Sequence, residues 1–142
     1  NASLVEGPGV VVGRKGTAGT VYWVDRDFWP IDTTFYVLPR GAIRSLTWIY
    51  HRLLAMDLAR LAADSAVPGV NRNAIYRQKW AVPEDDELIA KFDLLAIILM
   101  KRTRANLDQS RTLAEIRDTL LPKLISGEIR FPEAESALEE AV

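Results

Sequence analysis

The sequence predicts an α+β fold, in which a small mixed domain over residues 1–83 precedes one long, coiled-coil-forming helix over residues 84–131. Two observations predict this architecture. The first part contains short β-branched runs that are separated by glycine and proline. After Pro83, acidic residues mark a helix start, and apolar residues then recur at helical spacing for about ten turns. Residues 132–142 are expected to form an acidic tail.

The elements of the first part follow from local composition. Val10–Val12, Thr20–Val24 and Thr33–Leu38 have strand-forming residues and are followed by glycine, a polar loop or proline. The apolar spacing over Arg44–Ala63 predicts a helix. We expect a loop over residues 64–73 and a further strand over residues 74–82.

The long helix has recognisable ends. Acidic residues from Glu84 to Glu87 favour a first turn, where free N–H groups attract negative charge. The helix is expected to reach about Leu121, a length on the order of 50 Å. Pro122 lacks an N–H group, which predicts a break or kink there. Gly127 is expected to end a short second helical piece.

One side of this helix carries a seam whose residues alternate four and three positions apart. Such spacing keeps a line of side chains on one face and favours pairing with a second helix. Packing against the helix's own domain is the alternative, but a domain of this size would cover only part of it. The seam consists of Leu88, Phe92, Leu95, Leu99, Arg102, Asn106, Gln109, Leu113, Ile116 and Leu120.

Composition narrows the classes of function. The chain has no cysteine and one histidine, His51, which we expect on the helix surface. We therefore expect no disulfide, metal site or cofactor. No apolar run is long enough to cross a bilayer. The formal charge is −1 overall, which divides into +4 for residues 1–82 and −5 for residues 83–142. This asymmetry favours an anionic partner for the first part.

Catalytic motifs are absent from the sequence. The glycines of Gly13–Gly19 are not followed by the Lys-Ser/Thr pair of a phosphate-binding loop, and they do not fit the dinucleotide fingerprint. No Gly-x-Ser-x-Gly segment exists. No acid precedes a lysine by two positions, as it does in many metal-dependent nucleases. We therefore expect a protein without catalytic activity.

Two polar segments are candidate binding sites. Arg14, Lys15 and Thr17 lie between glycines, where backbone N–H groups and cations can meet phosphates. Arginine also pairs with guanine, and asparagine with adenine, which makes the polar run Asn71, Arg72 and Asn73 a second candidate. The alternative for the first segment is a hairpin turn with solvated charges. For the second it is an ordinary loop at the start of an element.

Half of the aromatic residues crowd into one stretch of the sequence. Stacking on nucleic-acid bases is one interpretation. Packing in the core of a small sheet is the favoured one. The six residues are Tyr22, Trp23, Phe28, Trp29, Phe35 and Tyr36.

Three segments resemble the specificity subunits of type I restriction–modification systems. The first is Gly13-Arg14-Lys15-Gly16-Thr17-Ala18-Gly19 together with Phe28-Trp29-Pro30-Ile31-Asp32-Thr33-Thr34-Phe35-Tyr36-Val37. The second is Val67-Pro68-Gly69-Val70-Asn71-Arg72 ahead of Pro83. The third, residues 113–127, is the most specific and is similar to the end of that family's conserved helix.

The resemblance implies a cytoplasmic, non-catalytic subunit that recognises double-stranded DNA. In that family, two target-recognition domains are held apart by two antiparallel helices. Methyltransferase subunits dock on these helices and modify adenine, and restriction subunits join the complex. DNA contacts are then expected from Arg14, Lys15, Thr17, Asn71 and Arg72, with Arg26 behind them.

The chain departs from that pattern in three ways. It has one recognition domain and one helix, so we expect a half subunit or fragment that forms a homodimer through the seam. The start of the recognition domain is expected to lie before Asn1. Residues 84–87 replace a Glu-Gln pair that is common in the family, which leaves the details of subunit docking open.

Two other functions fit the sequence. The chain could be the recognition end of a fused methyltransferase–endonuclease. It could also be a coiled-coil interaction protein without a role on DNA.

Overall fold

A computed structural model describes residues 4–41, 43–63 and 69–130 of the chain. It confirms the expected α+β class, with a small antiparallel sheet and one long helix at the C-terminal side. The chain divides into two compact units, residues 1–96 and residues 97–142, so the division falls inside the long helix. The expected acidic tail lies outside the described residues.

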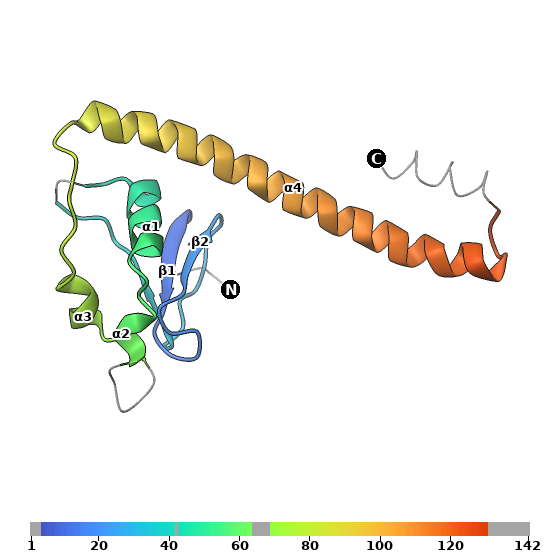
Figure 1. Cartoon of the computed structure of the whole chain (residues 1–142), viewed down its shortest axis with the longest axis horizontal. Coiled ribbons are helices and arrows are strands. Elements are labelled where there is room, and N and C mark those ends of the chain that lie inside the picture. The colour runs from blue at the N-terminus through green and yellow to red at the C-terminus, as the bar shows by residue number, and fades with distance from the viewer. Residues whose placement is uncertain (1–3, 42, 64–68, 131–142) are drawn as a thin grey trace. The chain divides into compact units, whose positions relative to one another are not determined.

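The sheet has the strand order β2-β1-β3, with both pairs antiparallel. β1 covers Gly9–Gly13, β2 covers Val21–Val24 and β3 covers Thr34–Tyr36, so the three predicted strands are confirmed. β1 is central because its β-branched residues are buried on both faces. In Figure 1, α1 (Leu46–Ala55) lies along β1 and β2.

The core lies between one face of the sheet and α1. Val10 and Val12 project to this face, and their neighbours on β2 and β3 include Trp23 and Phe35. Burying each of these valine side chains stabilises the fold by roughly 1.5–3 kcal/mol. The buried cluster consists of Val10, Val12, Val21, Ile43, Trp48, Ile49, Leu53 and Leu58.

The predicted helix over Arg44–Ala63 is wrong as a single element. The structure has α1 and a short α2 (Arg60–Ala63), separated by a turn in which Asp57 has a φ of 45°. The turn brings Leu58, only 1% exposed, into the core. A continuous helix would not allow this inward turn.

The predicted strand over Ala74–Val82 is also wrong. Residues Arg72–Tyr76 form the short helix α3, and an irregular segment follows. Ile75 and Trp80 pack against the core cluster, and the Trp80 ring lies 5.4 Å from that of Trp48. The apolar residues of this segment therefore reflect core packing and not a strand.

The long helix α4 covers Asp86–Ser126. Asp85 caps its start, because its carboxylate accepts a hydrogen bond of 2.8 Å from the Glu87 N–H. The predicted break at Pro122 is wrong, since α4 continues for four residues beyond it. Proline at this position removes one hydrogen bond, while the turns on either side retain theirs.

Gly127 ends a helix as predicted, but that helix is α4 itself and not a separate second piece. The φ of Gly127 is +72°, and its N–H donates to the Leu124 carbonyl at 3.2 Å. The next N–H, that of Glu128, donates to the Lys123 carbonyl at 2.9 Å. These two hydrogen bonds form a Schellman motif, which is common where a helix ends at a glycine.

The first turns of α4 belong to the N-terminal unit. Phe92 packs against the core cluster, with its ring 5.6 Å from the ring of half-buried His51. Asp93 accepts a hydrogen bond from the hydroxyl of Ser45, the residue that also caps α1. Ala96 is buried. The expectation that His51 lies on the surface is therefore met only in part.

Candidate nucleic-acid interface

The two polar segments singled out in the sequence lie next to each other in the structure. The Val70 N–H donates a hydrogen bond of 2.9 Å to the Arg14 carbonyl, which joins the end of β1 to the approach to α3. The Arg14 and Lys15 N–H groups donate to the Thr33 carbonyl, at 2.8 and 3.2 Å. Backbone bonds thus fix the position of both segments at one end of the sheet.

An open hollow of ≈ 470 Å³ lies where these segments meet. It contains three cations and two asparagines around one aromatic ring. Cationic side chains can bind the phosphates of a nucleic acid, and arginine and asparagine side chains can bind the edges of its bases. The lining residues are Arg14, Lys15, Phe35, Gly69, Val70, Asn71, Arg72 and Asn73.

Phe35 organises the two arginines of the hollow. The guanidinium carbon of Arg72 lies 5.2 Å from the centre of its ring, and that of Arg14 lies 5.7 Å from it. These are cation–π distances, at which the electron-rich face of the ring attracts a positive charge. The ring itself is half-buried against the core cluster. The core therefore supports the ring that positions both arginines.

The cations of the hollow form no ion pair in the described part of the chain. In the described ranges, no carboxylate lies within ion-pair distance of Arg14, Lys15 or Arg72. The Arg14 guanidinium donates a long hydrogen bond of 3.5 Å to the Asp32 carbonyl. The hollow is consequently a local region of positive potential in a chain whose overall charge is −1.

The loop that carries Arg14 and Lys15 is anchored at both ends by glycine. A side chain at Gly13 would meet the Thr17 carbonyl oxygen at 2.1 Å, and one at Gly19 would meet the Ala59 nitrogen at 2.3 Å. Gly16, at the tip of the loop, has nothing within 4 Å of the position of a β-carbon. The ends of the loop are therefore tightly packed and its tip is open.

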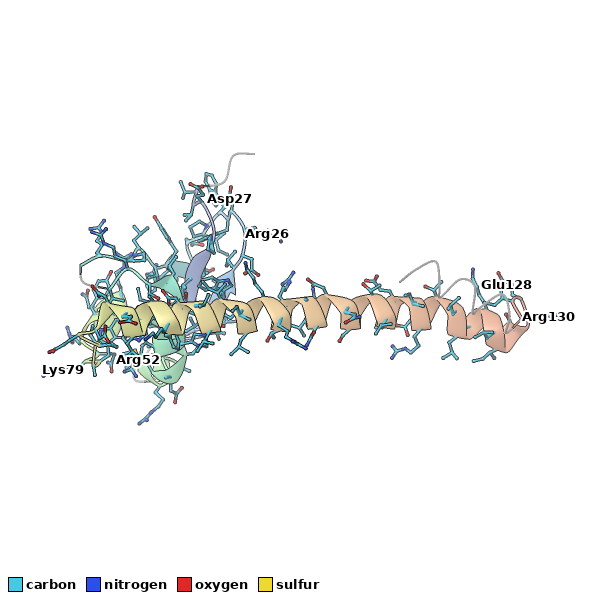
Figure 2. The ribbon with its side chains drawn as sticks, turned by 90° about the horizontal axis from the view of Figure 1, so that it is seen from above. Arg26, Asp27, Arg52, Lys79, Glu128 and Arg130 are labelled. Carbon is cyan, nitrogen blue, oxygen red and sulfur yellow. The ribbon has the colours of Figure 1, made fainter. Side chains whose placement is uncertain are left out.

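The structure brings four of the six predicted DNA contacts together. Thr17 lies in the same loop but does not line the hollow. Arg26 lies beside Asp27 on the connection from β2 to β3, as Figure 2 shows, and it does not line the hollow either. Phe35 and Asn73 were not among the predicted contacts. Asn73 belongs to the same polar run as Asn71, which is the signal that pointed to this segment.

The aromatic stretch divides between the two faces of the sheet. Trp23 and Phe35 pack on the core side, which confirms core packing for these two. On the other face, Val11 is flanked by Tyr22 and Tyr36. An apolar hollow of ≈ 350 Å³ opens there, and Trp29 beside it is 63% exposed. No cation lines this second hollow, whereas three cations line the first.

The seam of α4 is largely exposed. Leu95 and Leu99 are 63% and 64% exposed, and Leu113 is 53% exposed. In the described part of the second unit, residues 97–130, the structure is only α4 and the turn after it, so no other described element of that unit covers the seam. Phe92 packs on the N-terminal unit, and Ile116 and Leu120 are half-buried.

Searches of protein-family models, curated proteins and solved structures found no match to this chain. Among the described residues, no group of three or more histidine or acidic side chains is placed to hold a metal ion. None of the described helices is both long enough and apolar enough to traverse a lipid bilayer.

Proposed function

We propose that the chain is a sequence-specific DNA-recognition subunit of a type I restriction–modification complex. The observation that carries this proposal is the hollow between β1 and α3, where two asparagines and three cations with no ion pair among the described residues surround Phe35. The assignment to a type I complex rests on the resemblance of three segments to specificity subunits. The chain would read one half-site of a bipartite target.

DNA is the ligand that best explains the composition of the hollow. Phosphate oxygens would take up the charge of Lys15, which has no carboxylate near it in the described structure. Arginine and asparagine side chains pair with guanine and adenine through two hydrogen bonds each. A small acidic metabolite would satisfy the charges, but it would not explain the exposed amide of Asn73 beside them.

The exposed seam supports a second part of the proposal, which is a homodimer through α4. Burying leucines such as Leu95 and Leu99 against a second helix would remove their side chains from water. In a parallel pair, each seam residue would face its own copy, so two Arg102 side chains would repel each other. An antiparallel pair avoids this contact.

The seam also predicts the antiparallel register. With the two-fold axis near Arg104, Leu113 faces Leu95 of the other copy, and Leu120 faces Leu88. Asn106 faces Arg102 of the other copy at the centre, and Gln109 faces Leu99. All ten seam positions would then pair within the seam, although Phe92 must share its contacts with its own domain.

In this proposal the subunit performs no chemistry. The methyltransferase subunit would dock on the helical part, and a restriction subunit would join through the complex. Because the substrate is chromosomal or invading DNA, the complex would work in the cytoplasm.

The decisive experiment measures binding of the purified chain to duplex DNA over a range of salt concentrations. We expect the logarithm of the affinity to fall linearly with the logarithm of salt concentration, since phosphate contacts release counterions. Reconstitution with a type I methyltransferase subunit, followed by mapping of methylated adenines, would then identify the target. An affinity for DNA that does not depend on salt would contradict the proposal.

The exposed seam alone would equally suit a second candidate function, that of a coiled-coil interaction protein without a role on DNA. This alternative predicts the same homodimer, but no affinity for DNA. The same salt titration therefore separates the two functions.

A further inference from the structure

The two asparagines of the hollow have different hydrogen bonds. The side-chain oxygen of Asn71 accepts a bond of 2.8 Å from the Asn73 N–H and thereby caps α3. Pairing with adenine needs both the oxygen and the nitrogen of an amide. Asn71 has already committed its oxygen. The Asn73 side chain is exposed and has no hydrogen bond within the described structure, so its whole amide is free.

The three cations of the hollow also differ. Arg14 and Arg72 are held over the Phe35 ring, so less freedom is lost when each forms a two-pronged hydrogen bond. Lys15 has no ring contact in the described structure and carries a compact charge on a flexible stem. Its chemistry suits a phosphate, whereas the guanidinium groups suit the edge of a base.

We infer that Asn73, Arg14 and Arg72 read base edges, that Phe35 positions the two arginines, and that Asn71 serves only as a helix cap. This inference rests on the proposed function. The recognised half-site would then present an adenine next to a guanine in the major groove. Arg72 and Asn73 are consecutive in α3, so the two bases that they would read lie close together on the DNA.

The test selects bound sequences from a library of random duplexes, using the full-length chain and single variants of it. For the wild-type chain we expect an adenine beside a guanine among the preferred positions. Asn73→Ala should abolish the preference for adenine and leave the other positions unchanged. The affinity for the selected duplex should fall roughly 5- to 150-fold, which corresponds to the ~1–3 kcal/mol of one two-pronged base contact.

Asn71→Ser is the matched control. Serine also caps helices but has no amide, so the adenine preference should persist. Loss of that preference in Asn71→Ser together with its retention in Asn73→Ala would overturn the inference.

Two further variants test the arginines and their support. Arg72→Lys keeps the charge but loses the planar fork, so the guanine preference should weaken while the dependence on salt stays the same. Phe35→Leu keeps an apolar side chain against the core but removes the ring. It should weaken the preference for guanine in the same way. An unchanged preference in both variants would contradict the positioning role.

The wild-type result separates this inference from the proposed function. If the wild-type chain enriches no sequence and shows no salt-dependent affinity, both fail. If it enriches a sequence that Asn73→Ala enriches equally, only the inference fails. Because the Asn73 side chain has no described hydrogen bond within the chain, the alanine variant is expected to fold, and circular dichroism checks this.

Discussion

The hollow beside Phe35 and the seam of α4 are two exposed surfaces of opposite chemical character. The hollow is polar, and its backbone is fixed by hydrogen bonds such as that from Val70 to Arg14. The seam is apolar at both ends, and most of its residues in unit 97–142 are exposed, including Leu99 and Leu113. A pre-ordered polar surface favours a specific ligand, whereas an exposed apolar stripe favours association. The proposed function assigns the first surface to recognition and the second to assembly.

The largest expected effect comes from a charge in the seam. Leu99→Asp should convert the proposed homodimer to a monomer, because both copies of the leucine would leave a buried position. We expect the dimer dissociation constant to rise at least about 1000-fold, from the loss of roughly 2 kcal/mol or more at each copy. Analytical ultracentrifugation measures it. Leu107→Asp is the matched control, because Leu107 is 52% exposed on the same helix but lies off the seam.

The orientation of the pair has its own test. The chain contains no cysteine, so introduced thiols report directly on proximity. In the antiparallel register, Leu113→Cys protein mixed with Leu95→Cys protein should form a heterodimeric disulfide under mild oxidation, while either variant alone should not. Efficient cross-linking of Leu113→Cys to itself would indicate a parallel pair instead.

The next largest effect is on the stability of the N-terminal unit, residues 1–96. Leu58→Ala should lower the free energy of unfolding by about 2–5 kcal/mol, because Leu58 is only 1% exposed and a cavity would remain. Urea denaturation measures it. Leu54→Ala, at a position that is 46% exposed, should cost much less. Equal costs at the two positions would contradict the placement of the turn at Asp57.

A smaller effect is expected on DNA binding when two cations of the hollow are removed together. Arg14→Ala with Lys15→Ala should reduce the slope of log affinity against log salt by about 0.9, because Lys15 is the residue of the pair that would neutralise a phosphate. Fluorescence anisotropy with a random duplex measures it. Arg60→Ala, which removes an exposed charge that does not line the hollow, should leave the slope unchanged. An unchanged slope in the double variant would remove these residues from the interface.

The smallest effect concerns the cap of α3. Asn71→Ala should destabilise the chain by about 1 kcal/mol, and Asn71→Ser should largely restore its stability. Thermal denaturation of the three proteins compares them. A serine variant as unstable as the alanine variant would show that the hydrogen bond to the Asn73 N–H is not what Asn71 contributes.

The sequence predicted the elements whose structure is local. Val10–Val12 is a β-branched run that forms a strand, and Gly127 ends a helix because it adopts a positive φ. The prediction failed where contacts between residues far apart in the sequence determine the local structure. The turn at Asp57 depends on Leu58 entering the core, and the extended segment before α4 depends on Trp80 packing against Trp48. Neither contact has a signal in the local sequence.

The candidate site was predicted in pieces. Arg14 and Lys15, and separately Asn71 and Arg72, stood out by residue type and by nearby glycines. Nothing in the sequence indicated that a hydrogen bond between Val70 and Arg14 would join them. Phe35 could not be distinguished from an ordinary core residue, because it packs against the core and contacts both arginines.

The glycines of the β1–β2 loop limit which of its residues can be replaced. Gly13 and Gly19 have no room for a β-carbon, and Gly16 has room but a φ of +74°, which an L side chain rarely adopts. Substitutions that keep the loop backbone are therefore confined to Arg14, Lys15, Thr17 and Ala18. These four positions are the ones to randomise in a library that tests what the proposed interface binds.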